Sequence, residues 1–213
     1  MVVLAVLVAG FVLVVGGDRE IDGRASGVLA DEWSTLSDPA SGLSYQIPPI
    51  RWRTNPDVGT AGSVALTQGA ELTAYTCGTP VERLLRGVLG SGSAPRSGTA
   101  SDMATLADSV AVAAANQYYH DSGAPVVALD PPTRLNRTSH GTTLDGVLVR
   151  AVASQHADHC LASRGEVLVF VLRFGDHDGV LVVNGDLAGG PADPAPVTDT
   201  ELRAIVGTAR PTS

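Results

Sequence analysis

The chain opens with an apolar run that a water-exposed segment would not carry. Met1 to Gly17 reads MVVLAVLVAGFVLVVGG without a charged side chain, and Asp18, Arg19 and Glu20 end the run. As a helix it would be roughly 25 Å long, slightly less than the roughly 30 Å of bilayer hydrocarbon. We expect an uncleaved signal anchor or transmembrane helix at 1–17, with a cleaved signal peptide or a buried element as alternatives.

This segment predicts where the rest of the chain is found. An anchor would hold a domain on the extracytoplasmic side of a cell membrane, and a cleaved signal would secrete it. The basic flank that normally opens a signal peptide is lacking. We therefore leave open whether the segment is cleaved and whether residues precede it.

The remainder is predicted to be a tether at 18–32 and one domain at 33–213. The tether is acidic, rich in small residues and without periodicity, as expected of a solvated segment. About 180 residues remain, an ordinary length for one domain, and 44% of all residues are hydrophobic. The 14 basic residues are all Arg and are scattered over a chain of net charge −8. This pattern argues against nucleic-acid binding and against a polybasic lipid-binding patch.

The first part of the domain reads as strand, hairpin and short helix. Residues 43–47 alternate apolar and polar side chains, which predicts a half-buried strand before Pro48-Pro49. Residues 63–67 and 71–76 flank Gln68-Gly69-Ala70, which predicts a hairpin. Thr79, Pro80 and Glu82 form a helix-start signal for a short helix to about Leu89.

The second part reads as loop, long helix, sheet and closing helix. The Gly- and Ser-rich stretch 90–101 predicts an exposed loop. Apolar residues at three- and four-residue spacing predict an amphipathic helix over 102–120. Thr198 with Glu201 repeats a helix-start signal near the C-terminus. Four antiparallel strands are predicted between the helices, at 126–129, 143–153, 166–174 and 179–183, the third of them central and covered on both faces.

This order predicts an α+β fold, an antiparallel β-sheet covered by helices. The strand Gly42-Leu43-Ser44-Tyr45-Gln46-Ile47-Pro48, the following Trp52 and the ending from Thr198 to Pro211 resemble the PsbP-like α/β/α sandwich of actinobacterial cell-envelope proteins, the LpqN-like lipoproteins. The resemblance covers residues 33–211. It implies an accessory or binding protein without a transferable active site. The lipid-attachment cysteine of those lipoproteins is absent from this sequence.

Cys77 and Cys160 are the only cysteines in the chain, and each falls at the end of a predicted strand. An exported domain folds in an oxidising compartment, so we expect an intramolecular disulfide between them. Two separate buried thiols are the alternative, because sequence does not reveal whether the Cα atoms come within bridging distance.

A metal site is the alternative chemical reading. His156, Asp158 and His159 lie in one predicted turn, and His177 lies one strand later. Imidazole and carboxylate groups bind zinc or copper, and a hairpin could bring these four residues together. The spacing matches no recognised zinc motif, and polar residues are common in turns. We therefore expect no metal and no cofactor, and keep a metal-binding protein or metal-dependent hydrolase as the alternative function.

The motifs that would indicate an enzyme are missing from this sequence. It contains no G-x-S-x-G elbow, no phosphate-binding loop ending in Gly-Lys-Ser/Thr and no Rossmann glycine fingerprint. We expect a non-enzymatic binding or accessory domain of the bacterial cell envelope. Its expected partner is an envelope protein or an apolar ligand such as a cell-wall lipid.

Overall fold

A computed structural model describes residues 32–78, 80–120, 123–156 and 159–212. They form two helices, α1 (Ala100–Tyr118) and α2 (Asp199–Thr208), and fourteen strands. The strands are β1 (Ser34–Asp38), β2 (Leu43–Ile47), β3 (Trp52–Thr54), β4 (Thr60–Ala61), β5 (Val64–Cys77), β6 (Glu82–Pro95), β7 (Val126–Leu129), β8 (Thr133–Arg134), β9 (Arg137–Ser139), β10 (Thr142–Leu144), β11 (Gly146–Ser154), β12 (Ala162–Arg173), β13 (His177–Gly189) and β14 (Arg210–Pro211).

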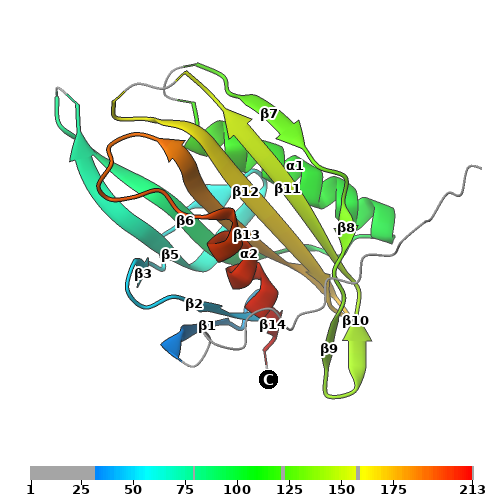
Figure 1. Cartoon of the computed structure of the whole chain (residues 1–213). Helices are drawn as coiled ribbons and strands as arrows, with labels where there is room; N and C mark the ends of the chain where they lie inside the picture. The colour runs from blue at the N-terminus through cyan, green and yellow to red at the C-terminus, as the bar shows by residue number, and fades with distance from the viewer. Residues whose placement is uncertain (1–31, 79, 121–122, 157–158, 213) are drawn as a thin grey trace, which may run out of the picture.

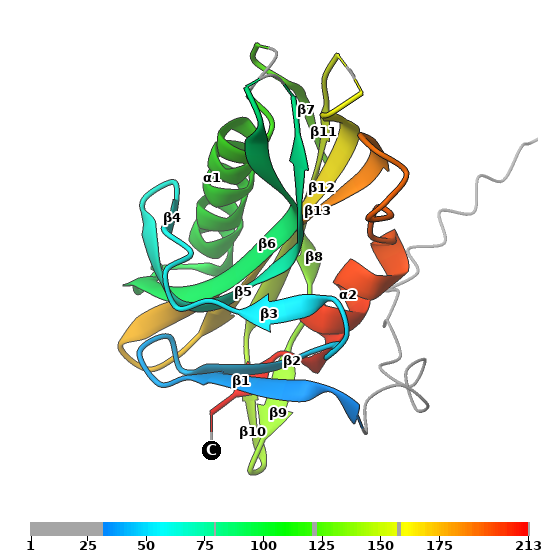
Figure 2. The ribbon, with the colours of Figure 1, turned by 90° about the vertical axis from the view of Figure 1, so that its left-hand side faces the viewer.

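Nine strands make one antiparallel sheet. Its order is β3-β5-β6-β13-β12-β11-β7, with β4 added to β5 and β8 added to β11. Helix α1 covers one face of this sheet, and α2 lies on the other face beside the small sheet β1-β2-β14 (Figure 1, Figure 2). The predicted antiparallel sheet covered by helices is therefore confirmed.

Strand β12 carries both cores of the domain, one on each face. Val167 and Val169 belong to the apolar cluster under α1, and Leu168 and Phe170 belong to the cluster under α2. All eight residues from 165 to 172 are buried. Side chains alternate between the faces of a strand, so a strand covered on both sides is apolar at nearly every position, and Glu166 is the charged exception in this run. This is the central strand predicted from the sequence.

Helix α1 is the long amphipathic helix predicted from the sequence, and it begins two residues earlier than expected. Thr99 caps it: the Thr99 hydroxyl accepts from the Asp102 amide, and the Asp102 carboxylate accepts from the Thr99 amide. The buried face is made mainly of small residues, including Ala107 and Ala114. Small side chains let the helix pack closely on the valine-rich face of the sheet.

The short helix predicted from Thr79 to Leu89 and most of the predicted loop 90–101 are wrong. Thr79 lies outside the described residues, and β6 occupies both segments from Glu82 to Pro95. Two neighbouring strands pair with β6 along its length. A Cβ on Gly92 would lie 2.0 Å from the Ala65 carbonyl oxygen. The glycines of this segment therefore permit close packing inside a sheet. They were interpreted from the sequence as the composition of a loop.

The predicted hairpin around Gln68-Gly69-Ala70 is also wrong, because β5 runs through these residues without a turn. The pairing of β5 with β6 shifts between Leu66 and Gln68, as it does at a β-bulge. Glycine is common both in turns and at bulges, so its presence alone did not distinguish them.

The two ends of the chain differ in how far the structure describes them. The Thr198 hydroxyl accepts from the Glu201 amide at 3.1 Å and caps α2, as predicted. The predicted anchor at 1–17 and the predicted tether up to residue 31 lie outside the described residues. Within the described part of the chain, neither helix combines the length and the apolar character needed to cross a membrane.

Candidate functional site

The predicted disulfide between Cys77 and Cys160 is present and draws one end of the sheet together. Cys77 ends β5 and Cys160 precedes β12, which lies three strands away in the sheet. In a flat sheet three strand spacings amount to about 14 Å. The two Cα atoms are 5.6 Å apart. The end of β5 and the segment that leads into β12 therefore approach each other across β6 and β13.

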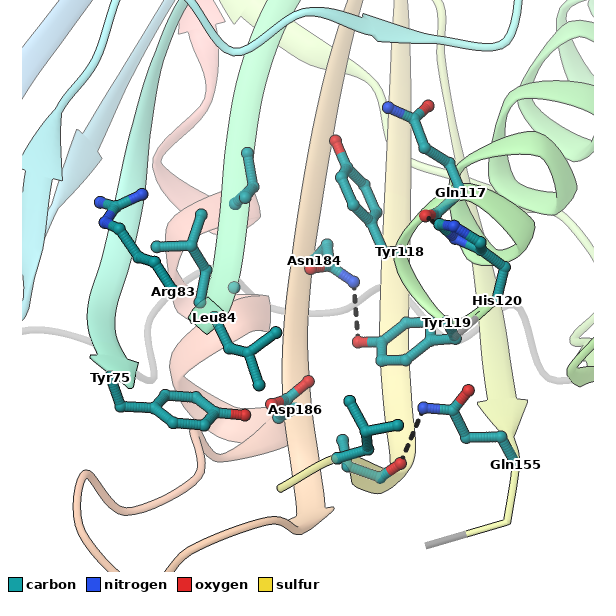
Figure 3. A pocket seen from close by; sticks show the side chains of 15 residues that line it. Tyr75, Arg83, Leu84, Gln117, Tyr118, Tyr119, His120, Gln155, Asn184 and Asp186 are labelled. Carbon is teal, nitrogen blue, oxygen red and sulfur yellow. Dashed lines mark hydrogen bonds between the residues drawn. The ribbon is translucent and has the colours of Figure 1, made fainter. Parts of the chain in front are cut away.

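A polar pocket of about 260 Å³ lies at this end, beside the C-terminus of α1 (Figure 3). A helix of 19 residues is about 28 Å long, whereas a strand of 13 residues reaches about 43 Å, so the sheet extends beyond the helix. The pocket occupies this uncovered part. Its lining is Tyr75, Arg83, Leu84, Leu85, Gly87, Val88, Gln117, Tyr118, Tyr119, His120, Gln155, Leu161, Ala162, Asn184 and Asp186.

Tyr119 and Asn184 form the inner wall of the polar pocket. The Asn184 amide donates a 2.7 Å hydrogen bond to the Tyr119 hydroxyl, and both side chains are buried (Figure 3). Burial raises the pKa of Tyr119 well above its ordinary value. A Cβ on Gly165 would lie 1.9 Å from the Tyr119 ring, so only glycine leaves room for the ring on β12.

A buried ion pair between Arg86 and Asp186 supports the same pocket. Arg86 Nη1 lies 3.2 Å from Asp186 Oδ2, and Arg86 also donates to the carbonyl oxygens of Gly189, Pro191 and Pro194. Its guanidinium lies over the Tyr75 ring at 4.8 Å from the ring centre. Burial raises the pKa of Asp186 to about 6, against the opposing effect of Arg86.

Of the four residues proposed as metal ligands, the three that the structure describes are not brought together. Asp158 lies outside the described residues, and His156 and His159 are exposed between β11 and β12. His177 lies at the start of β13, where its ring stacks on Phe174 and its Nδ1 lies 2.7 Å from Asp176. The whole of β12 separates His177 from the other candidates. A hairpin brings together the strand ends that flank its turn, and these two segments lie at opposite ends of one strand.

A different set of ligand atoms meets at the disulfide. The side chains of Cys77, His159 and Cys160 place one nitrogen and two sulfurs within 4.8 Å of one another. Because the two sulfurs are bonded to each other, neither is a thiolate, the form of cysteine that binds metals. The arrangement in this structure is therefore a disulfide beside a histidine.

An apolar groove of about 590 Å³ lies between α2 and the segment from Pro48 to Arg51. The Ile50 side chain on its rim is 92% exposed. The described chain begins in this groove, at Glu32 and Trp33. The full lining is Glu32, Trp33, Pro48, Pro49, Ile50, Arg51, Thr198, Thr200, Glu201 and Ala204. Below, this hollow is called the apolar groove.

A smaller hollow of about 190 Å³ adjoins the apolar groove, and we call it the arginine hollow. It is lined by Ile50, Arg51, Arg53, Glu71, Thr73, Ala74 and Arg83. Ile50 and Arg51 line the apolar groove as well, and Arg83 also lines the polar pocket. The arginine hollow therefore lies between the other two hollows, with the apolar groove on one side and the polar pocket on the other.

Residues 27–213 match the family described as Domain of unknown function (DUF8017). The chain belongs to this family. No curated protein matches the chain. This DUF8017 chain is similar in structure to cyanobacterial PsbP (CyanoP) from Synechocystis sp. PCC 6803, at 11% identity and a TM-score of 0.46, over 90% of this chain and 99% of that protein.

A second similar structure is a crystal structure from Bacteroides thetaiotaomicron VPI-5482, at 9% identity and a TM-score of 0.42. The likeness covers 85% of the DUF8017 chain and 49% of the other chain, so this chain spans about half the length of that protein. Both likenesses concern the fold alone.

The apolar groove and the arginine hollow of this DUF8017 chain were not predicted from its sequence. Pro48, Pro49, Arg51 and Arg53 were visible as a strand ending and as scattered arginines. The one local signal in the sequence was Ile50 directly after Pro48 and Pro49, because an apolar residue placed after a proline-terminated strand can remain exposed. The partner elements, α2 and β5, lie far away in the sequence.

Proposed function

We propose that this chain is a non-enzymatic binding domain of the bacterial cell envelope, anchored through residues 1–17 with its domain on the extracytoplasmic side, and that it binds an apolar ligand in the apolar groove. The observation that carries the proposal is the exposed Ile50 on the rim of this groove. Burying an isoleucine side chain stabilises a complex by roughly 1.5–3 kcal/mol. A concave apolar surface of several hundred Å³ is the usual form of a small-molecule site.

The polar pocket is a weaker candidate for ligand binding because its inner groups already bind one another. Asn184 bonds to Tyr119, and Asp186 pairs with Arg86. A ligand there would have to compensate for each of these contacts that it displaces. The apolar groove offers exposed carbon surface, whose burial is favourable without such an exchange.

Two further features support the extracytoplasmic part of the proposal. Disulfides persist in oxidising compartments, and Cys77 and Cys160 are joined. The uncharged run from Met1 to Gly17 has the composition of a signal anchor. The strand pattern that resembles LpqN-like proteins and the use of arginine for every basic residue agree with an actinobacterial envelope protein.

Photo-crosslinking tests the ligand site in the full-length chain. The chain is reconstituted in nanodiscs, irradiated with a dodecyl probe that carries a diazirine, and digested, and the labelled peptides are mapped by mass spectrometry. We expect saturable labelling of peptides that contain Trp33, Ile50 or Ala204. Ile50→Ser should reduce this labelling, whereas Val126→Ser should not, because Val126 is 75% exposed on the opposite edge strand β7. Equal labelling of the wild type and of Ile50→Ser would reject the site.

Cell fractionation tests the location. The full-length chain should be recovered with the membrane, and its domain should be cut by protease added outside intact cells. A variant that lacks residues 1–17 is the control and should lose the membrane association. Recovery of the full-length chain from the cytosol would contradict the proposal.

A further inference from the structure

The arginine hollow has a local charge opposite to that of the whole chain. Its charged lining consists of Arg51, Arg53, Arg83 and Glu71, which gives a net charge of +2 from three arginines and one glutamate. The chain as a whole has a net charge of −8. A cationic concavity on an acidic protein concentrates anions at that place.

The arginines differ in how far neighbouring groups already neutralise them. Arg83 pairs with Glu71 at 2.7 Å, and the same carboxylate accepts from Asn55 at 2.7 Å. Arg51 lies 3.7 Å from Glu201. Arg53 makes no ion pair with any residue that the structure describes, and its side chain is exposed. Glu71 lies opposite Arg53 in the β3–β5 pairing, and its carboxylate is already bound by Arg83 and Asn55. An incoming anion would therefore find Arg53 without an ion pair and Arg83, 59% exposed, within the same hollow.

The position of this charge beside the apolar groove identifies the class of ligand. Ile50 and Arg51 line both hollows, so a molecule in one contacts the boundary of the other. Resting on the function proposed above, we infer that the site takes an anionic amphiphile, with its apolar chain in the apolar groove and its anionic group at Arg53 and Arg83. Arginine binds phosphate and carboxylate oxygens through paired N–H groups, which suits this position.

The backbone between the two hollows is held in place by hydrogen bonds to other parts of the chain. The Arg51 carbonyl accepts from the Thr73 amide at 3.1 Å and from the Thr73 hydroxyl at 3.3 Å. Arg51 also donates to the Ala195 carbonyl, and the neighbouring Trp52 is buried. The spacing between groove and hollow is thus set before a ligand arrives, which lowers the entropy cost of binding.

The test compares three probes on the full-length chain in nanodiscs. Two carry the same diazirine-bearing dodecyl chain, one with a phosphate head and one with an uncharged maltoside head, and the third is inorganic phosphate as a competitor. We expect the phosphate probe to label the groove peptides at a concentration at least about tenfold lower than the maltoside probe. Inorganic phosphate at the same concentration should not displace it, because it lacks the apolar chain.

Arginine variants test whether the positive charge of the hollow, rather than an intact fold, determines binding of the phosphate probe. Arg53→Gln with Arg83→Gln should raise the half-saturating concentration of the phosphate probe at least about tenfold and leave that of the maltoside probe unchanged. Arg96→Gln, an exposed arginine outside the three hollows, should change neither.

The outcomes distinguish this inference from the proposed function. Equal labelling of the groove by both dodecyl probes would overturn the anionic class while leaving the apolar site intact. Groove labelling by neither probe would overturn both. Displacement of the phosphate probe by inorganic phosphate alone would identify a simple anion site and would overturn the inference that the ligand is an amphiphile.

Discussion

The indole N–H of Trp52 donates a 2.9 Å hydrogen bond to the Glu201 carboxylate and ties β3 to the first turn of α2. Trp52 is 3% exposed, so its side chain is almost wholly removed from bulk water. The same carboxylate lies 3.7 Å from Arg51 in a partly exposed ion pair of small expected value. This contact holds together the two elements between which the apolar groove lies.

Glu201→Ala should therefore lower the free energy of unfolding by about 1–3 kcal/mol, because it leaves the buried indole N–H without an acceptor. Glu201→Gln is the matched control: it keeps an acceptor oxygen and removes only the charge, so it should stay close to the wild-type value. Urea denaturation of the full-length chain measures both. Equal losses in the two variants would show that the charge, and not the hydrogen bond, carries the contact.

Removing one partner of the Arg86–Asp186 pair should cost about 3–5 kcal/mol of stability, since the other charge remains buried. Arg86→Met should be worse than Asp186→Leu, because three backbone carbonyls also lose their donor. The double variant should lose less than the sum of the two single losses. Chemical denaturation of the three variants forms the thermodynamic cycle, and strictly additive losses would contradict direct coupling.

Glu166 should make the domain less stable as the pH rises. Burial raises the pKa of Glu166 from 4.5 to about 7. The neighbouring Arg150 opposes this rise in pKa, and Asp199 adds to it. Between pH 4.5 and pH 7 the folded state binds more protons than the unfolded state. The stabilisation that Glu166 contributes below pH 4.5 is therefore lost as the pH rises through 7. Glu166→Gln should flatten the fall in unfolding free energy between pH 4.5 and 7.

Urea denaturation at a series of pH values measures this slope. Some slope should remain in Glu166→Gln, because the pKa of Asp186 is also raised and contributes with the same sign. At pH 8 the variant should be at least as stable as the wild type. A variant that is less stable at pH 8 would mean that the ion pair with Arg150 outweighs the burial of the charge.

The disulfide should contribute about 4.5 kcal/mol, the value expected from loop entropy for cysteines 83 residues apart. Cys77→Ser with Cys160→Ser should lower the melting temperature by the same amount as reduction of the wild type. Mass spectrometry without reductant should detect a Cys77–Cys160 linked peptide in the exported protein. Labelling of both cysteines as free thiols would reject the bond.

Some elements could be predicted from the sequence because their determinants are local. The strand at 43–47 and the 3.6-residue periodicity of α1 each depend on a few neighbouring residues. The strand was expected to be half-buried, and four of its five residues are buried because β1 and β14 flank it and the main sheet and α2 cover it. The cap at Thr198 requires only an amide three residues away. With two cysteines in the chain, a single intramolecular pairing was available to predict.

Other features depended on strands and side chains that meet only in the folded chain. Gly90 and Gly92 became part of β6 because β5 and β13 pair with it on both sides, which outweighs the local turn preference of glycine. His177 was separated from His159 by the length of β12, which no spacing in the sequence reveals. The segment at Ile50 faces α2 about 150 residues later in the chain. Local sequence was therefore sufficient for the strand at 43–47, the cap at Thr198 and the cysteine pair, whereas the groove and the arginine hollow depend on packing that brings distant residues together.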